Sequence, residues 1–553
     1  MVVIFATIHS KLQIRSVARG EGVVERLRRS TLIHFKSLPP MLRKSVFFAL
    51  LLWLSAVPSD SSARIQASDP YQVTKAYYEK LRSGGSKSDV AELRLFLSLM
   101  PKGGDIHHHF SGATYAESYL DMVRKAGCWV NRNDYSVICP EDAGSLKDTL
   151  SVDNLRKDNR LLSTFYSRWS DKDYYNHSHD TDAPDVQFFG TFAYFSKILS
   201  RNSPTYYREG ISILKQRAKI ENVQYIETML VSSGYKNTDS NFDASIRAAS
   251  GNEQQFRSTL DGFMAVIRND PAFNDKVNQY LKLVNDCSIG VDDESFTLRY
   301  QSYVSRTLSP SEFFSGLVAA FYEASKSPLV VGVNVVSSEN NPVSMSDYKV
   351  HMQMFRYLKA KFPDVKTTMH AGELTMGMVR PEELTFHISD ALSVAGAGRI
   401  GHGVDIAYEA NAPAALDYMR QKPVPVEICL TSNEFILGVK GNEHPIDLYA
   451  RSGVPLVIAT DDAGVSRNNL ANEYLLLATR YGYSYDFLRE VVGNSIRYSF
   501  MNEQDKRRNM QLLNMKFAEF ESRISNFVGS QHMKRSTARP AGIMRPPVTT
   551  GPR

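Results

Sequence analysis

The sequence has little cysteine, no long apolar run and no basic excess over most of its length. Four cysteines among 553 residues are too few for a fold held together by a disulfide framework. The longest apolar run, Val46 to Leu54, has nine residues, whereas a membrane-spanning helix needs about 20. We therefore expect a globular protein with no permanent membrane span, large enough for one barrel with insertions or for several ordinary domains.

The net charge of +6 comes from the two ends of the chain. Residues 1–64 contain ten Lys or Arg against three acidic residues, and residues 530–553 contain five against none. The rest of the chain has 50 basic and 56 acidic residues. It shows no basic patch interleaved with aromatic residues, the pattern typical of a nucleic-acid groove. Nucleic acid is therefore not an expected partner.

Residues 41–63 have the three parts of a secretory signal peptide. Met41-Leu42-Arg43-Lys44 is basic, the apolar run follows, and Ser61-Ser62-Ala63 supplies small residues for cleavage. Because export normally starts at the amino terminus, we interpret residues 1–40 as an upstream artefact or extension, with translation beginning at Met41. The alternative is that the apolar run is a buried helix. The signal predicts a periplasmic or secreted protein, in which Cys128 and Cys139 could close a hairpin loop as a disulfide.

Short apolar runs alternate with longer amphipathic stretches from residue 103 onward. Eight of these runs are typical of buried strands: 103–110, 223–230, 296–304, 329–336, 365–369, 399–406, 424–430 and 455–460. Helical patterns fill most of the gaps, for example 309–325 and 347–361. This order predicts an α/β fold, a (β/α)₈ TIM barrel over residues 70–528. We interpret residues 113–185 as an insertion after strand 1, and the Pro/Arg-rich residues 529–553 as a disordered basic tail.

Polar residues gather at the ends of the predicted strands, where a barrel carries its functional site. In the run Asp105-Ile106-His107-His108-His109, strand alternation puts His107 and His109 on one face and His108 on the other. His370 and Asp461 end two other strands. Three imidazoles and one carboxylate suit zinc and leave one position for water, so we expect one Zn²⁺ per chain. The metal would lower the pKa of that water to about 7.

Three residues near the predicted ligands could carry acid–base chemistry. Glu373, three residues after His370 and kept protonated by burial, could act as a general acid. His402 lies between two glycines that would let a ligand approach closely, and it could orient and deprotonate the water. Asp462, beside Asp461, would face the substrate. Singly, a strand histidine is more often a core group and an Asp pair often caps a helix, but their joint placement at several strand ends favours a metal site.

These motifs resemble those of the adenosine deaminase family of metal-dependent hydrolases. The resembling segments are Met100 to Gly103 leading into His107-x-His109, His370-Ala371-Gly372-Glu373, Arg399 to Gly403, Ser432-Asn433 and Thr460-Asp461-Asp462. The resemblance covers roughly residues 95–510. The insertion, the cysteine pair and the export signal are most similar to the secreted, growth-factor-related branch of that family.

The resemblance implies an adenosine deaminase, which adds water at C6 of adenosine and releases inosine and ammonia. It implies that Glu373 protonates purine N1, that His402 serves the attacking water and that Asp462 hydrogen-bonds N7. The substrate-binding residues that it implies are Ser111, Phe188, Phe192, Ser337, Gly372 and Asp462. Phe188 and Phe192 would belong to a hydrophobic helix over the nucleoside, with ordinary core packing as the alternative.

Two positions depart from the family pattern and leave the substrate open. Ser111 stands where the family usually has an Asp that contacts ribose, and Ser337 stands where it usually has a Gly whose amide contacts the purine. The expected partner is a small purine nucleoside, either adenosine or 2′-deoxyadenosine, with another aminopurine or a modified adenosine as the alternative. AMP is less favoured because no Lys/Arg cluster lies near the motifs to hold a phosphate.

The sequence also allows two functions outside this chemistry. The chain could be a nucleoside- or receptor-binding growth-factor-like protein on a deaminase scaffold, or an amidohydrolase for a non-purine amide. The combination of Glu373 and His402 argues against a pure binding protein, which has no need of both. The sequence leaves the oligomeric state open, and a homodimer is one assembly that it allows.

Overall fold

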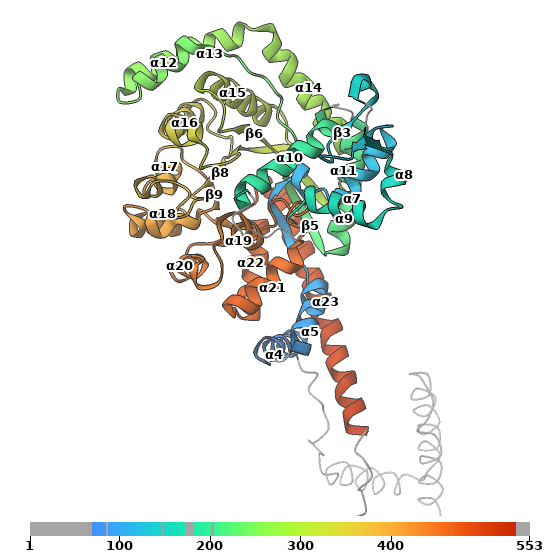
Figure 1. The fold of residues 1–553 in the computed structure, drawn as a ribbon. Helices are drawn as coiled ribbons and strands as arrows, with labels where there is room; N and C mark the ends of the chain where they lie inside the picture. Colours follow the sequence, from blue (N-terminus) through green and yellow to red (C-terminus); the bar gives the residue numbers. More distant parts are fainter. Residues whose placement is uncertain (1–68, 85–86, 146–147, 172–181, 201–203, 538–553) are drawn as a thin grey trace, which may run out of the picture. The chain divides into compact units, whose positions relative to one another are not determined.

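Buried β-branched and aromatic residues build eight parallel strands that follow one another in chain order around a barrel (Figure 1). The computed structural model describes residues 69–84, 87–145, 148–171, 182–200 and 204–537. Four strands pair in the order β1-β5-β6-β7 and four in the order β8-β9-β10-β11. Single parallel bridges, His108 to Asp461 and Val333 to Thr367, join the two sheets at both seams. The predicted (β/α)₈ barrel is confirmed.

The barrel strands are β1 (Gly103–His109), β5 (Val223–Met229), β6 (Thr297–Ser305), β7 (Val330–Val336), β8 (Thr368–Ala371), β9 (Arg399–His402), β10 (Val426–Ile428) and β11 (Leu456–Ile458). The longer helices outside the insertion are α4 (Pro70–Ser83), α5 (Lys87–Leu99), α11 (Pro204–Ile220), α12 (Ser240–Ala248), α13 (Glu253–Asn269), α14 (Pro271–Ser288), α15 (Pro310–Lys326), α16 (Pro342–Lys361), α17 (His387–Ser393), α18 (Ala412–Gln421), α19 (Leu430–Leu437), α20 (Ile446–Arg451), α21 (Leu470–Tyr481), α22 (Tyr485–Arg497) and α23 (Glu503–Thr537).

Each predicted strand is present, but some ends differ from the prediction. β9 ends at His402 rather than Ile406, because His402 and Gly403 both take left-handed backbone conformations, with φ of +65° and +60°. Similarly, α16 begins at Pro342 rather than Asp347. The Asn341 side chain accepts a hydrogen bond from the Val343 amide and Pro342 occupies the first helical position, so the start of the helix is capped.

The segment between β1 and α11 adds helices and a small antiparallel sheet of its own. This segment contains α6 (Phe110–Ala113), α7 (Ala116–Lys125), β2 (Trp129–Asn131), β3 (Val137–Ile138), η1 (Pro140–Ser145), β4 (Thr149–Leu150), α8 (Val152–Leu155), α9 (Asn159–Arg168) and α10 (Pro184–Ser200). The sheet order is β3-β2-β4. Its apolar cluster also includes Val404, Ile436 and Val465, which follow β9, β10 and β11. The segment therefore packs on the loops at the carboxyl ends of the barrel strands.

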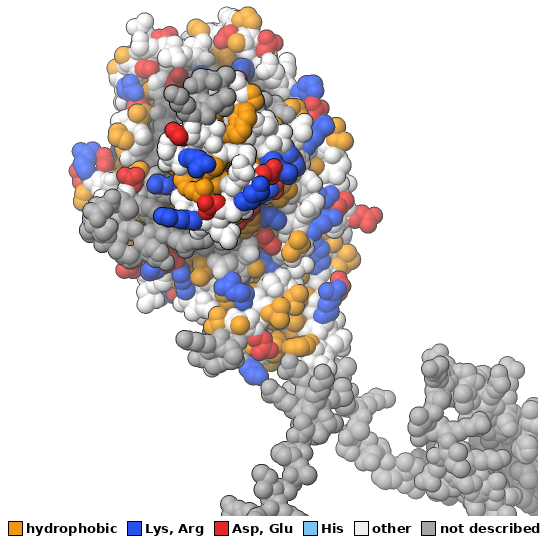
Figure 2. All heavy atoms as spheres, turned by 45° about the vertical axis from the view of Figure 1, so that its right-hand side comes forward, with side chains coloured by type: hydrophobic (Ala, Val, Ile, Leu, Met, Phe, Trp, Pro, Cys, Tyr) orange, Lys and Arg blue, Asp and Glu red, His pale blue; other side chains and the backbone are white. Residues whose placement is uncertain are grey.

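On the face drawn in Figure 2, Lys and Arg side chains are interspersed with Asp and Glu. Within the described ranges, no helix combines the length and apolar character needed to cross a bilayer. The predicted signal peptide at 41–63 and the preceding residues 1–40 lie outside those ranges. Helix α23 continues to Thr537, into the segment predicted to be a tail, since the first proline there is Pro540. Residues 538–553 lie outside the described part.

Candidate metal centre and active site

The four predicted metal ligands come together at the carboxyl end of the barrel. His107 and His109 lie on β1, His370 lies on β8 and Asp461 follows β11. One ligand atom from each of the four lies within 4.8 Å of the others. The shorter separations are 3.1 Å between the Nε2 atoms of His109 and His370, and 3.2 Å from His109 Nε2 to Asp461 Oδ1.

Hydrogen bonds on the far side of three of the ligands orient them toward the common centre. His107 Nδ1 lies 2.6 Å from Glu427 Oε2 on β10, and His370 Nδ1 lies 3.2 Å from Asn334 Oδ1 on β7. Because each oxygen accepts the Nδ1 proton, each Nε2 keeps a lone pair for a metal. Ser432 Oγ donates to Asp461 Oδ2 at 2.7 Å, which leaves Oδ1 free to face the centre.

Two of the predicted ligand atoms have no hydrogen-bonding partner, and a cation would satisfy both. His107 Nε2 and Asp461 Oδ1 are both buried without a partner, 3.5 Å apart. Ligands at the usual zinc distances of about 2.0–2.1 Å in a tetrahedron are separated by about 3.4 Å. Three of the separations in this cluster, 3.1–3.5 Å, match that spacing. The donor set therefore fits a tetrahedral divalent metal.

The charges around the centre also favour a cation. Burial opposes protonation of His107, but Asp461 and Glu427 outweigh it and raise the pKa of the imidazole to about 10. Likewise, His107 and His109 outweigh burial and hold the pKa of the Asp461 carboxyl well below its usual range. The site thus attracts positive charge even without a metal. Glu427 is itself held by Arg399, whose guanidinium also contacts Glu227 at 2.6 Å.

Glu373 lies next to this cluster as a protonated carboxyl, as the sequence predicts. Its side chain is 7% exposed, and burial, followed by the negative charges of Asp461 and Glu339, raises its pKa well above the usual range. The Glu339 carboxylate holds the loop that carries Glu373, because it accepts hydrogen bonds from the Gly372 and Glu373 amides at 3.3 and 2.8 Å. This carboxyl can therefore donate a proton inside the site.

His402 points its Nε2 atom into the same space. Nε2 is buried without a hydrogen-bonding partner and lies 3.6 Å from Glu373 Oε1. The flanking glycines make room for protein atoms, not for a ligand as the sequence suggested. A Cβ on Gly401 would approach His107 Cε1 to 2.6 Å, and one on Gly403 would approach Tyr449 Oη to 2.5 Å. The two glycines thus let the His107 ring and Tyr449 pack against this loop.

Asp462 is the third acidic group at the centre. Its Oδ1 atom is buried without a partner. Burial and the adjacent Asp461 charge raise the pKa of the Asp462 carboxyl well above its usual range, so this carboxyl also carries a proton. A Cβ on Gly112 would overlap Asp462, which explains why glycine occupies that position beside it.

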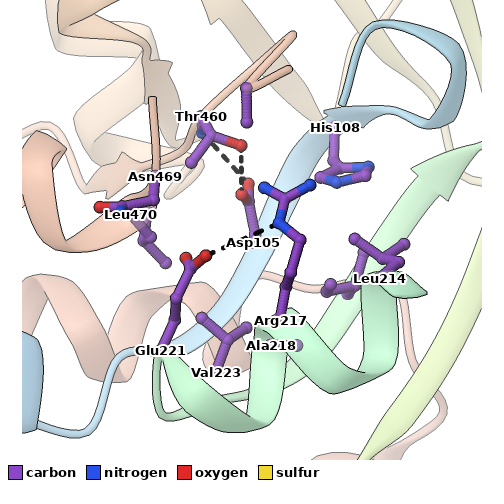
Figure 3. A pocket seen from close by; sticks show the side chains of 12 residues that line it. Asp105, His108, Leu214, Arg217, Ala218, Glu221, Val223, Thr460, Asn469 and Leu470 are labelled. Carbon is purple, nitrogen blue, oxygen red and sulfur yellow. Dashed lines mark hydrogen bonds and ion pairs between the residues drawn. The ribbon is translucent and has the colours of Figure 1, made fainter. Parts of the chain in front are cut away.

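His108 lies away from the metal ligands, as strand alternation predicts. It lines a cavity of about 20 Å³ between β1 and α11, together with Asp105, Arg217 and Glu221 (Figure 3); a cavity of this size holds about one water molecule. Its Nδ1 atom lies 2.8 Å from Thr228 Oγ1. Burial, and then the nearby Arg217 charge, lower the pKa of His108 to about 3. His108 is therefore a neutral packing residue.

A family comparison matches the segment that contains most of this site. The family model described as adenosine deaminase matches residues 276–515, which include His370, Glu373, His402 and Asp461. Over this segment the chain is similar to the adenosine deaminase family. The adenosine deaminase of Yersinia pseudotuberculosis is 33% identical over 149 residues, covering 27% of this chain and 41% of that protein. The chain thus matches less than half the length of this curated relative.

Solved structures show the same fold as this chain at low sequence identity. Arabidopsis ADAL in complex with IMP is 17% identical with a TM-score of 0.51, covering 77% of this chain and 99% of that chain. Arabidopsis N6-mAMP deaminase MAPDA is also 17% identical, with a TM-score of 0.50 and coverages of 76% and 99%. These similarities support the barrel fold.

The two departures from the adenosine deaminase family pattern lie at the mouth of the site. Ser337 follows β7 and has φ of +80°, the left-handed conformation that favours the glycine usual at this position. Its backbone therefore keeps a glycine-like course, while its hydroxyl lies 2.8 Å from Ser305 Oγ. Ser111 lies in α6, is partly exposed, and its carbonyl accepts a hydrogen bond from Tyr119. Gly372 is buried with φ of +74° and lies directly before Glu373.

Helix α10 carries Phe188 and Phe192 and packs against elements at the mouth of the barrel. Phe188 is buried in the apolar cluster of the insertion, and Phe192 is partly buried against it. The helix contacts α6 and α19, which follow β1 and β10. At its start, Asp185 accepts a hydrogen bond of 2.9 Å from Asn340 in the loop after β7. Both phenylalanines take part in this packing, and a contact with the nucleoside stays a prediction.

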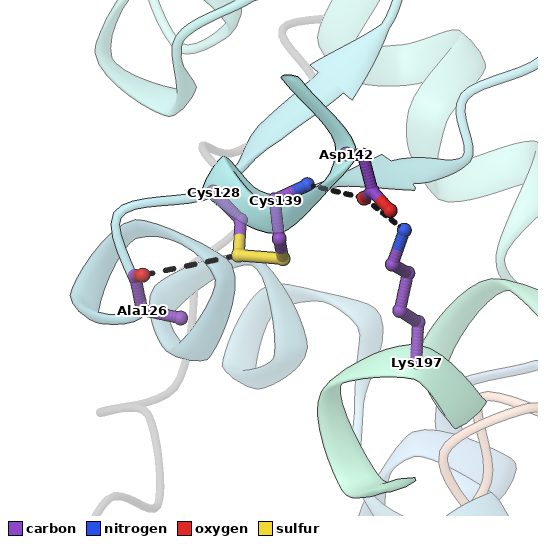
Figure 4. Close-up of a disulfide and its surroundings, with 5 residues drawn as sticks. All are labelled: Ala126, Cys128, Cys139, Asp142 and Lys197. Carbon is purple, nitrogen blue, oxygen red and sulfur yellow. Dashed lines mark hydrogen bonds and ion pairs between the residues drawn. A yellow bond between two sulfur atoms is a disulfide. The ribbon is translucent and has the colours of Figure 1, made fainter. Parts of the chain in front are cut away.

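A disulfide ties the insertion together beneath α10. Cys128 and Cys139 are bonded, with Cα atoms 4.3 Å apart (Figure 4). Asp142 accepts a hydrogen bond from the Cys139 amide and pairs with Lys197 of α10. The bonded pair is therefore linked through Asp142 to the helix over the barrel mouth. Cys287 and Cys429 are free and buried.

The sequence did not point to the residues that orient the ligands and hold the loop of Glu373. Glu427, Asn334 and Glu339 are all buried and polar, and their partners lie far away in the chain; His107 and Glu427, for example, are 320 residues apart. The available signal was a lone acidic residue inside the apolar run 424–430. Such a residue must find a partner when buried.

Proposed function

We propose that this protein is an exported, zinc-dependent adenosine deaminase that converts adenosine and water into inosine and ammonia. The observation that carries this proposal is the convergence of four ligand atoms beside two buried carboxyls, Glu373 and Asp462, whose pKa values are raised by burial. The similarity to the adenosine deaminase family model and to curated adenosine deaminases supports the same chemistry.

The metal would be held by His107, His109, His370 and Asp461, one ion per chain. Zinc bound there supplies a Lewis acid that brings the pKa of a bound water near 7. The protein supplies the remaining groups. Purine N1 and N7 are both hydrogen-bond acceptors, so groups that face them must donate. Glu373 and Asp462 meet this requirement because burial keeps both carboxyls protonated.

Each of these groups then has one task. Glu373 donates to N1, which makes C6 more electrophilic and offsets the charge that develops on the ring. Asp462 donates to N7 and fixes the orientation of the purine. His402 Nε2 orients the attacking water beside C6. Water adds at C6 and gives up one proton to N6 and the other to the Glu373 carboxylate. The C6–N6 bond then breaks, ammonia leaves, and N1 keeps the proton that Glu373 donated.

A second candidate within the same chemistry is deamination of another aminopurine or a modified adenosine. It is favoured by Ser111 and Ser337, which alter the two positions that face ribose and purine in the family pattern. A protein that only binds a nucleoside or a receptor on this scaffold would not need Glu373 and His402.

The test is turnover by purified protein loaded with zinc. We expect the ultraviolet change of deamination and release of ammonia with adenosine or 2′-deoxyadenosine, and loss of both after chelation of the metal. The panel should include adenine, N6-methyladenosine and AMP. Turnover of only one of these would support the second candidate function instead. Binding without turnover of any aminopurine would refute deaminase activity.

Export is supported by the signal-like residues 41–63 and by the Cys128–Cys139 disulfide. Mass spectrometry of the protein recovered outside the producing cells is expected to find a new amino terminus shortly after Ala63. Retention inside the cell with residues 41–63 intact would contradict export.

A further inference from the structure

Two buried residues outside the predicted ligand set connect His402 to a backbone amide. Asn433 lies in α19 and His444 follows η4 (Gly441–Glu443). They are 0% and 3% exposed. Asn433 Nδ2 lies 3.0 Å from His402 Nδ1, and Asn433 Oδ1 lies 3.1 Å from His444 Nε2. The Ile446 backbone amide donates to His444 Nδ1 at 3.2 Å.

The Ile446 amide determines the direction of every hydrogen bond in this series. A backbone amide can only donate, so His444 Nδ1 accepts and its ring proton lies on Nε2. Nε2 of His444 must then donate, which identifies the facing atom of Asn433 as its oxygen. The Asn433 amide nitrogen therefore faces His402 and donates to Nδ1. Since Nδ1 of His402 accepts, the proton of that ring lies on Nε2.

We propose that Asn433 and His444 are positioning residues that fix the His402 proton on Nε2, so that His402 meets the reacting groups as a hydrogen-bond donor. This inference rests on the proposed function for its catalytic meaning, but the tautomer itself does not depend on it. It also revises the role given to His402 from sequence, because a nitrogen that already carries a proton does not remove one from water.

A donor at this position has a specific use in the proposed reaction. His402 Nε2 is buried, has no partner within the protein and faces the space beside Glu373 Oε1. An N–H fixed there can hold the oxygen that attacks C6 and stabilise the negative charge that it brings. Removal of one such preorganised donor typically lowers kcat by about 10²- to 10³-fold.

The first experiment reads the tautomer directly by nitrogen NMR of full-length protein labelled with [¹⁵N]histidine. The His402 signals are assigned by their loss in His402→Gln. We expect Nε2 to be the protonated nitrogen and Nδ1 the unprotonated one in the wild type. In Asn433→Asp, a carboxylate faces Nδ1, so the two nitrogens should exchange their states. A wild-type spectrum with the proton on Nδ1 overturns the proposal whether or not the protein deaminates anything.

The second experiment separates positioning from general packing. His444→Gln keeps an amide donor toward Asn433 and should retain the tautomer and most of kcat. By contrast, His444→Leu removes the donor, so we expect a mixed tautomer and a kcat about 10²-fold lower with a smaller change in KM. His351→Leu is the matched control, since His351 is similarly buried but stacks on Phe313 and is not part of the hydrogen-bond series to His402. Equal kcat losses in His444→Gln and His444→Leu, with an unchanged tautomer, would refute the positioning role of His444.

Discussion

Three non-glycine residues at the carboxyl ends of barrel strands have left-handed backbone conformations. They are Ser337, His402 and Asp461, with φ of +80°, +65° and +59°. Such conformations cost of order 1–3 kcal/mol each and persist only where the surroundings hold them. Two of the three face the proposed metal centre and the third lies at its mouth. The left-handed conformations turn the chain sharply after β9 and β11, so that His402 and Asp461 project into the site.

Glu373 gives the most direct test of the acid role. In Glu373→Gln the side chain keeps its size and its hydrogen-bonding groups but has no ionisable proton to give to N1. We expect kcat to fall by about 10²- to 10⁴-fold, with zinc content unchanged because Glu373 is not a predicted ligand. Steady-state kinetics and elemental analysis of the same preparation check both parts. Wild-type turnover in this variant would exclude Glu373 as the acid.

The three consecutive histidines of β1 provide a matched pair of variants for the metal. His107→Ala removes one of the four ligand atoms and leaves Glu427 without its imidazole partner, so we expect loss of zinc and of activity. His108→Ala changes a neighbouring ring that faces a separate cavity and bonds to Thr228. It should therefore bind one zinc per chain. Elemental analysis decides this, and loss of zinc from both variants would contradict the strand alternation argument.

At the scale of elements, the packing of α15 against β6 buries a carboxyl that should make stability depend on pH. Glu323 of α15 accepts a hydrogen bond from Ser302 Oγ of β6 at 2.6 Å, and burial raises the pKa of Glu323 from 4.5 to about 8. Between these values the folded chain keeps a proton that the unfolded chain has released. The free energy of unfolding therefore falls as pH rises from about 4.5 to 8, by at most about 5 kcal/mol.

Glu323→Gln should remove this contribution, because the amide does not ionise and can still accept from Ser302. We expect the variant to gain stability relative to the wild type as pH rises, and to differ little from it near pH 4.5. Denaturant unfolding of both proteins at pH 5 and pH 8 measures the difference. Other buried acids, such as Glu473, whose pKa is raised to about 7 by burial, contribute the same pH dependence to both proteins, so their contribution cancels in the difference. An equal difference at the two pH values would contradict the prediction.

The sequence was sufficient for the order of the barrel and for the four residues that converge at the predicted metal centre, and insufficient for what orients them. β-branched runs such as 329–336 and the alternation in 107–109 are local signals, so they predict strands and faces correctly. The end of β9 depended on a left-handed turn at a histidine, which no local pattern indicates. Asn433 and His444 gained their proposed role only through contacts with His402, 31 residues away from Asn433 in the chain, and with the Ile446 amide.

At the scale of the whole molecule, the predicted ligands lie across a seam of the barrel. β1 and β11 belong to different sheets and are joined by the bridge between His108 and Asp461. The Asp461 amide donates to His107 O at 3.0 Å, and the His109 amide donates to Asp461 O at 3.3 Å. His107 and His109 contribute ligands from one side of this seam, and Asp461 contributes from the other. A metal at the centre therefore cross-links the two edges of the ring.

Removal of the metal should consequently loosen this seam more than the rest of the barrel. Without a cation, His107 Nε2 and Asp461 Oδ1 are buried polar atoms with no partner, a state that costs free energy. With free zinc at about 100 times its dissociation constant, binding adds about 2.7 kcal/mol to the free energy of unfolding. We expect chelation to lower Tm and to speed amide exchange in residues 103–109 and 456–462, while exchange in α12 and α13 stays unchanged. His107→Ala should show neither response to zinc, and uniform faster exchange throughout the barrel would contradict a role at the seam.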